Sequence, residues 1–453
     1  MAQIRSPPPV SPALGCFVAR SAWAAMPEGL RHEAKRSMLN SIGCALGVSR
    51  SAPIEQAIAV HRRFAGPAQA TLIGRPERLD LLGASFINAA GANLLDFDDT
   101  HLDTVIHPTA PVAPPALALG EHYRMSGAAV LQAFILGAEI ECRIGNAVSP
   151  GHYARGWHIT STCGVFGAAV ASAKLLGLSA EETAHTIGIA ASQSAGLVEN
   201  LPSSAKNVSV GNAARNGLFA ALMAQAGYEA APTAIEGPLG WARSMGDAAD
   251  VEEILGGLGT RWELLKNTYK PYPSGIVFHA VTDASLKLRK DYVLAPDAIR
   301  DVTVSGDALL LARGDRPVNT ERDARVSIHH TAAIAFVFGT AGVTDYERAA
   351  VFDPRIQAFR AKVRAALAPD MPRGAARVHV TLTDGRALSA TVLHPRGSLE
   401  DPLSDREIEA KVRDCARQGA PGCDAEAIIA EVWRLDERAD LGALAASLTP
   451  AAR

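Results

Sequence analysis

Apolar residues recur with the period of an α-helix over most of the first 265 residues of the chain. In the segment 128–140, which follows Ser126, apolar side chains cover nearly the whole circumference, as in a helix at the centre of a bundle. The run 179–182, Ser-Ala-Glu-Glu, predicts the capping box of another helix, and residues 211–227 predict a third helix that stops at a glycine. The pattern therefore predicts a large helical domain.

The pattern changes after the turn-rich segment 269–275. Val302 and Val304 alternate with polar residues, and residues 378–392 alternate around Asp384-Gly385, which predicts a hairpin with a two-residue turn. Helical periodicity returns after the cap signal 404–407. We predict a mainly α protein in which an all-helical domain, 14–267 plus 397–453, carries an inserted α+β lid domain, 268–396. Residues 1–13 are predicted to be a flexible proline-rich tail.

Composition narrows the class of protein. A chain of 453 residues exceeds what one hydrophobic core normally supports, so two domains are expected. The net charge is −3 without a basic stripe, which argues against nucleic acid as a partner. The six cysteines lack zinc-ligand spacing and predict reduced thiols. Neither a signal peptide nor a run of eighteen apolar residues occurs, so we expect a cytoplasmic protein without membrane contact.

The segment 93–107 is the strongest candidate for chemistry. On a helix, Asp96, Asp99 and Thr100 would share one face. Pro108 disfavours helical backbone at His107, which predicts that this imidazole lies on a loop. A carboxylate that orients a histidine is a common general acid or base. Alternatively, the acids only cap or solvate the end of a helix.

Further candidates lie in three short segments. Residues 153–158 combine a phenol, a guanidinium, an indole and an imidazole before a helix, a content suited to an anion and a proton donor. Lys206 is set among small residues, and Lys270 lies in the turn-rich segment 269–275. Either lysine could face a carboxylate. His329-His330 begins an apolar helix, so one of the two should face inward. Each also has a simpler interpretation, as a core anchor, a solvated lysine or a linker residue.

Several common catalytic and cofactor-binding motifs are absent from the sequence. The sequence contains no Walker loop, no dinucleotide-binding glycine motif, no nucleophile elbow and no H-E-x-x-H metal pair. Acids, imidazoles and lysines remain, which predicts proton transfer on an anionic substrate without a metal or another cofactor.

The chain resembles the MmgE/PrpD family from about residue 14 to residue 440. The resemblance is carried by the runs Leu95–Thr100 with His107-Pro108, Gly156-Trp157-His158, Lys206 before residues 211–214, and residues 270–273. It implies a homodimer with an active site in the cleft between its two domains. Asp96, His107, His158, Lys206 and Lys270 would be catalytic, and Thr100, Tyr153, Arg155 and His330 would bind substrate. In that assignment Asp96 orients His107, and the lysines hold substrate carboxylates.

Two positions depart from the pattern of family members that dehydrate or decarboxylate tricarboxylates. Gly275 stands where a histidine is frequent, and His330 stands where a tyrosine is frequent. Both departures favour an epimerase-like branch over itaconate formation, and His279 could partly replace the missing imidazole.

Three hypotheses follow. The first is a cofactor-independent lyase for a small di- or tricarboxylate, most readily a hydro-lyase resembling 2-methylcitrate dehydratase, with decarboxylation of the cis-aconitate type as an alternative. The second is an epimerase or isomerase of an imino- or amino-dicarboxylate, such as iminodisuccinate. The third is a catalytically silent dimeric binding protein.

Overall fold

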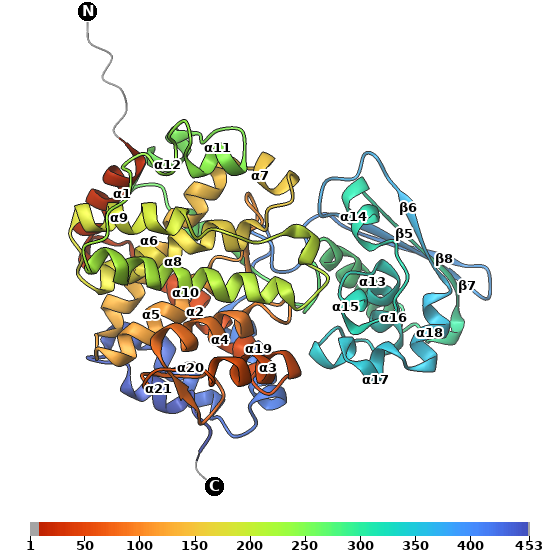
Figure 1. Ribbon diagram of the computed structural model, residues 1–453. Coiled ribbons are helices and arrows are strands. Elements are labelled where there is room, and N and C mark those ends of the chain that lie inside the picture. Colours follow the sequence, from red (N-terminus) through yellow and green to blue (C-terminus); the bar gives the residue numbers. More distant parts are fainter. Residues whose placement is uncertain (1–8, 452–453) are drawn as a thin grey trace, which may run out of the picture. The chain divides into compact units, whose positions relative to one another are not determined.

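A computed structural model describes residues 9–451 of the chain, which form two compact units (Figure 1). The helical unit contains residues 9–94, 98–267 and 405–451, and the sheet unit contains residues 95–97 and 268–404. Residues 397–404 stay with the sheet unit, in which Gly397 approaches the backbone of Tyr269 so closely that a Cβ would lie 2.2 Å from its carbonyl oxygen.

The prediction that residues 1–13 form a flexible tail is wrong for residues 10–13. Helix α1 begins at Val10, directly after Pro9, whose φ of −53° suits the entry to a helix. Leu14 and Val18 of this helix are buried, so its apolar face contributes to the core. Residues 1–8 lie outside the described part of the chain.

The helical unit consists mainly of helices, several of which are long and buried. They are α1 (Val10–Arg20), α2 (Glu28–Val48), α3 (Ala52–His61), α4 (Leu81–Ala92), α5 (Thr109–His122), α6 (Gly127–Val148), α7 (Gly151–Ala154), α8 (Ile159–Leu175), α9 (Ala180–Ala191), α10 (Ala205–Gln225), α11 (Trp241–Met245), α12 (Val251–Leu255), α19 (Asp405–Gly419), α20 (Ala425–Trp433) and α21 (Gly442–Ser447). The predicted caps of α6 at Ser126 and of α9 at Ser179 are confirmed. The helix predicted from 211 begins earlier, at Ala205.

The prediction that this unit is entirely helical is wrong in detail. Strands β1 (Ala70–Thr71) and β2 (Arg78–Leu79) form an antiparallel pair, and β3 (Asp99–His101) follows α4. Helices nevertheless dominate, so the mainly α class is confirmed. Within residues 9–451, no helix combines the length and the apolar character that a membrane span requires.

Glycines explain how the central helices pack. Helix α8 packs against both α6 and α10. A Cβ at Gly137 of α6 would lie 2.5 Å from the carbonyl oxygen of Gly167 in α8, and a Cβ at Gly217 of α10 would lie 2.6 Å from the amide nitrogen of Ala169. Side chains at these crossings would force the helices apart, so the many small residues follow from close helix contacts.

A buried arginine ties α6 to the chain after α12. Arg143 is fully buried, and its Nε donates to Glu139 Oε1 at 2.5 Å. Its two terminal nitrogens donate to four carbonyl oxygens, those of Ile254, Gly256, Gly257 and Arg261. This side chain therefore satisfies backbone acceptors of the segment 254–261.

The sheet unit contains a four-stranded sheet in the order β6-β5-β7-β8. The strands are β5 (Ile299–Gly306), β6 (Val363–Leu367), β7 (Ala376–Leu382) and β8 (Ala387–Val392). Strand β5 runs parallel to β6 and antiparallel to β7, and β7 pairs antiparallel with β8. The strand β4 (Asn267–Tyr269) precedes them, and the helices are α13 (His279–Asp291), α14 (Ala308–Gly314), α15 (Glu321–Ala324), α16 (Ile328–Val337), α17 (Arg348–Val351) and α18 (Pro354–Arg360).

The predicted β7–β8 hairpin is confirmed, but its turn is longer than two residues. The amide of Leu382 donates to the carbonyl oxygen of Arg386, so residues 383–385 lie between the bonded pair. Gly385 has a φ of +89°, a left-handed conformation that favours glycine.

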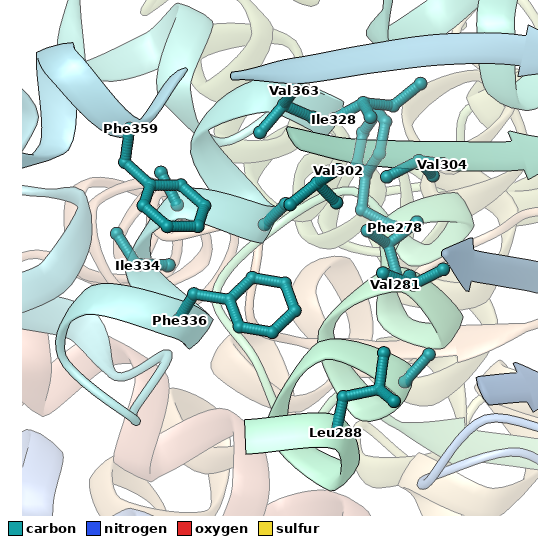
Figure 2. Close-up of a cluster of buried hydrophobic side chains, with 14 of the residues drawn as sticks. Phe278, Val281, Leu288, Val302, Val304, Ile328, Ile334, Phe336, Phe359 and Val363 are labelled. Atoms are coloured by element: carbon teal, nitrogen blue, oxygen red, sulfur yellow. The ribbon is translucent and has the colours of Figure 1, made fainter. Parts of the chain in front are cut away.

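The core of the sheet unit lies between the sheet and its helices. Figure 2 shows Val302 and Val304 of β5 facing Phe278, Val281 and other apolar side chains. Helices α13 and α16 both pack against the sheet. The period-two pattern of β5 therefore points its valines into this core, as predicted.

Candidate active site

The acidic segment after α4 is not a continuation of that helix. Helix α4 ends at Ala92, Asp96 has a φ of +57°, and Asp99–His101 form strand β3. The prediction that Asp96, Asp99 and Thr100 share a helical face is therefore wrong, because the left-handed residue breaks the helical register. This conformation places Asp96 in the sheet unit and Asp98 onward in the helical unit.

His107 lies on a loop before α5, as predicted, and its tautomer is fixed by the backbone. Its Nδ1 lies 2.7 Å from the carbonyl oxygen of Asp99 and 3.2 Å from Thr100 Oγ1. A carbonyl oxygen only accepts, so Nδ1 carries the proton and donates it to Asp99. In the neutral ring Nε2 is then the basic nitrogen, which suits His107 to proton transfer.

The carboxylate of Asp98 also faces the His107 ring. Asp98 is fully buried, and its Oδ1 lies 3.7 Å from His107 Nδ1. Its other oxygen accepts from Asn93 Nδ2 at 2.5 Å, and Asn93 in turn accepts from Asn207 Nδ2 of α10. A buried negative charge at this distance stabilises the protonated imidazole. The sequence analysis assigned the carboxylate beside His107 to Asp96; within the helical unit, the carboxylate 3.7 Å from the ring is that of Asp98.

His158 is fixed in the same tautomer as His107. It is the N-cap residue of α8, and its Nδ1 lies 3.2 Å from Ser209 Oγ and 3.4 Å from Ser161 Oγ. The Ser209 hydroxyl donates to the carbonyl oxygen of Lys206 and the Ser161 hydroxyl to that of His158. Since both hydroxyl protons are used, the His158 Nδ1–H must donate, which leaves Nε2 as the basic nitrogen of the neutral ring.

The first turns of α8 and α10 bring these groups together. The amide of His107 donates to Thr160 Oγ1, two residues after His158 in α8. Ser209 links His158 to the backbone of Lys206 in α10, and Lys206 is only 2 % exposed. Thr100, His107, His158 and the backbone of Lys206 are therefore linked by these hydrogen bonds and by the short stretch of chain from His158 to Thr160. A cation with two tautomer-fixed imidazoles can bind an anion and move protons.

Behind His107, Asp99 is a buried acid with a strongly shifted pKa. Burial and, to a smaller extent, the charge of Asp98 raise the pKa of Asp99 to about 7, against the lowering effect of a hydrogen bond from Thr109. Asn267 Nδ2 also donates to Asp99, at 2.6 Å. Burial likewise raises the pKa of Glu141 well above its usual value, with a contribution from Asp99. Asp99 and Glu141 are therefore two buried acids with raised pKa values.

Asp99 makes stability depend on pH with a definite sign. In the unfolded chain its pKa is near 3.8, whereas the folded protein holds the proton up to about pH 7. The stabilisation is therefore complete below about pH 4 and lost as the pH rises to about 7. Between pH 5 and pH 7.5, the wild-type protein should lose about 3 kcal/mol more unfolding free energy than Asp99→Asn. Unfolding in urea at both pH values measures the difference.

The control for this prediction is Asp247→Asn, which changes an aspartate that is 79 % exposed. It should have the pH dependence of the wild type. An Asp99→Asn protein with the wild-type pH dependence would contradict the assignment of the shifted pKa to Asp99.

In the sheet unit, Asp96 and Lys270 form a buried ion pair. Lys270 Nζ donates to Asp96 Oδ1 at 3.0 Å and to its backbone oxygen at 3.2 Å, and Lys270 is 2 % exposed. Arg322 adds a longer contact of 3.9 Å to the other carboxylate oxygen. Arg325 donates to the carbonyl oxygen of Leu95, which holds the 95–97 segment in this unit. Two residues that were predicted separately to be catalytic are thus adjacent.

The other predicted residues are Arg155, Tyr153 and His330. Arg155 is half-exposed and pairs with Asp247, and Tyr153 lies on the short helix α7. His330 is the inward-facing histidine of its pair: it is fully buried, and its Nε2 donates to the carbonyl oxygen of Asp345 at 2.9 Å. Burial lowers the pKa of His330 to about 4, so this ring is neutral at physiological pH.

The structure also explains what Gly275 permits. A Cβ at this position would lie 2.9 Å from the ring of Phe278, so a larger residue requires that ring to move. His279, the suggested substitute imidazole, is buried at the start of α13, and its Nε2 lies 3.4 Å from the carbonyl oxygen of Ser274.

One cluster in the helical unit has the residue types of a metal site. His101, Asp103 and Glu263 bring one ligand atom each to within 4.8 Å of one another. Lys266 Nζ, however, lies 3.1 Å from Asp103 and 2.9 Å from Glu263. Arg261 Nε also lies 3.3 Å from Glu263, so two cations face the two carboxylates and the cluster is better described as an ion-pair network.

Sequence reasoning missed four polar residues of the site. Asn93, Asp98, Asn207 and Ser209 received no role, although each lies within a few residues of a predicted one. The available signal was an uncharged or acidic polar side chain within an apolar helical segment, which in a buried position needs a hydrogen-bond partner.

Comparisons with known proteins cover almost the entire chain. The family model of the MmgE/PrpD N-terminal domain matches residues 13–254, and that of the MmgE/PrpD C-terminal domain matches residues 272–437. The cis-aconitate decarboxylase of Mus musculus is 26 % identical over 436 residues, which cover 92 % of this chain and 88 % of the relative. The enzymes of that name from Homo sapiens and Aspergillus terreus are also 26 % identical, over 90 % and 86 % of this chain and 88 % and 86 % of their own lengths.

Proposed function

Because the chain belongs to the MmgE/PrpD family, we propose that it is a cofactor-independent lyase that acts on a small di- or tricarboxylate by proton transfer next to a carboxylate. The observation that carries the proposal is the pair of tautomer-fixed histidines, His107 and His158, joined to Lys206 through the first turns of α8 and α10. Proton transfer at carbon needs a base, an acid and a cation, and this group supplies all three.

In the proposed reaction one histidine acts as the base. Nε2 of one ring removes the proton from the carbon next to a substrate carboxylate, and the electron pair of the broken C–H bond passes into the enediolate. Lys206 stabilises the developing negative charge. The enediolate electron pair then forms the carbon–carbon double bond, the C–O bond breaks, and the protonated Nε2 of the other ring donates its proton to the leaving hydroxyl group, which departs as water. Asp98 supports the protonated form of His107.

Elimination of water is the finer reaction that we propose first. Gly275 and His330 depart from the pattern of family members that dehydrate or decarboxylate tricarboxylates; they argue against itaconate formation and keep an epimerase of an imino- or amino-dicarboxylate as a further candidate. Decarboxylation of a cis-aconitate-type substrate is the second candidate, because the relatives reported above carry that activity in their names. Asp96 and Lys270, and substrate contacts of Thr100, Tyr153, Arg155 and His330, remain predictions, as does a homodimer.

Proton NMR in deuterated water tests the proposal. The protein is incubated in turn with 2-methylcitrate, citrate, cis-aconitate and iminodisuccinate. A new alkene signal from a hydroxy acid supports dehydration, and loss of carbon dioxide from cis-aconitate supports decarboxylation. Deuterium that enters an unchanged skeleton instead indicates an epimerase, which would contradict the lyase. Silence on all four substrates would favour a binding protein.

The role of Lys206 makes a further prediction. Lys206→Met removes the buried cation but keeps the length of the side chain, so kcat/KM should fall by about 10²-fold or more. Lys174→Met is a matched control, since Lys174 donates to backbone carbonyls of α1 and its C-cap residue and has no predicted role in catalysis. Equal activities of the Lys206 variant and the wild type would show that this cation does not act on the substrate.

A further inference from the structure

The sheet unit contains a pocket of about 490 Å³ that none of the proposed catalytic residues lines. It is bordered by the segment that follows α14, by α16 and by α18. Its polar lining residues are Asp315, Arg316, His329, Gln357 and Arg360. The apolar part of the lining includes Val318 and Ala361. We call it the arginine pocket.

Arg360 brings a poorly compensated positive charge to this pocket. Its Nη2 donates to the carbonyl oxygen of Val351 at 2.9 Å, whereas Nη1 is buried and has no hydrogen-bond partner among residues 9–451. Burial lowers the pKa of Arg360, which is the direction expected when no carboxylate pairs with the guanidinium. A buried donor without a partner costs free energy.

Arg316 adds a second cation. It is half-buried, and no carboxylate of the described chain lies within ion-pair distance of its guanidinium. The one acid of the pocket, Asp315, accepts instead from His329, whose Nε2 lies 2.9 Å from Asp315 Oδ1. The other ring nitrogen lies 3.0 Å from the carbonyl oxygen of Val363.

Asp315 faces His329 rather than the arginines. Within residues 9–451, no ion pair joins Asp315 to Arg316 or to Arg360. The two guanidinium charges outnumber this single carboxylate in a concave surface. Concave walls strengthen the field of such charges.

We propose that the arginine pocket binds a small multivalent oxyanion, either an organic polycarboxylate or phosphate. Guanidinium groups match the geometry of carboxylate and phosphate oxygens. Gln357 can donate a further hydrogen bond, and Val318 and Ala361 can cover the carbon skeleton of an organic anion. This proposal does not depend on the reaction catalysed, because no residue of the pocket takes part in the proposed catalysis.

Isothermal titration of the full-length protein tests the pocket with two probes, tricarballylate and inorganic phosphate, used separately. We expect at least one probe to bind, with a Kd that rises tenfold or more in Arg316→Gln and in Arg360→Gln. The rise in Kd caused by Arg316→Gln should be the same in a protein that also carries His107→Asn, which separates the pocket from the candidate active site. Binding of tricarballylate alone would identify a polycarboxylate site, and binding of phosphate alone a phosphate site.

Arg386→Gln is the matched control. Arg386 is 70 % exposed on the turn between β7 and β8, so this variant removes the same charge from the same unit outside the pocket. It should bind each probe within twofold of the wild type. The proposal is overturned if neither probe binds, if both pocket variants bind like the wild type, or if Arg386→Gln weakens binding equally. Arg316 is half-buried, so its variant keeps the test valid should Arg360→Gln fail to fold.

Discussion

Replacing His107 with asparagine is expected to lower kcat by about 10²- to 10⁴-fold, the usual contribution of a general acid or base. The asparagine Nδ2 can take the place of the imidazole Nδ1 and donate to the carbonyl oxygen of Asp99, which His107 contacts at 2.7 Å. Nothing replaces Nε2, so the loop keeps its hydrogen bond and loses only the proton-transferring atom. The measurement is kcat on whichever carboxylate turns over in the NMR experiment.

Two comparisons make this test specific. His122→Gln changes an exposed histidine at the end of α5 and should leave kcat unchanged. The thermal midpoint of His107→Asn should stay close to that of the wild type, which shows that the fold persists. Wild-type turnover by a folded His107→Asn protein would exclude His107 as acid or base.

Replacing Arg143 with methionine is expected to destabilise the protein by about 3–5 kcal/mol, the cost of breaking a buried ion pair from one side. The substitution leaves Glu139 without its 2.5 Å partner and leaves the carbonyl oxygens of Gly256 and Arg261 without the donors that Arg143 supplies. Glu139 is already buried enough that its pKa is raised to about 7. Differential scanning calorimetry should therefore show a markedly lower thermal midpoint.

A double-mutant cycle separates the ion pair from the backbone contacts. Glu139→Gln with Arg143→Met removes both charges, so it should lose less stability than the sum of the two single changes. The residual loss reports the unsatisfied carbonyl groups. Additive losses would show that the two side chains are not coupled, against the geometry described here.

The helices could be predicted from the sequence because their signals are local. The capping residues Ser126 and Ser179 and the apolar circumference of 128–140 act over one or two turns, and the structure confirms them. The alternation of Val302 and Val304 similarly predicted β5. The helix end before Asp96 was missed, because a left-handed residue without glycine carries no strong sequence signal.

The candidate site likewise combines features that the sequence determines with features that only the packing of the chain determines. The sequence by itself determined which residue types are present, namely two histidines, two lysines and a group of acids near small-residue helices. Only the tertiary structure decided that Asp98 faces His107, that Ser209 sets the tautomer of His158, and that Asp96 pairs with Lys270. Periodicity reports which face of an element is buried, whereas hydrogen-bond partners come from segments far apart in the chain, so their identity depends on how those segments pack.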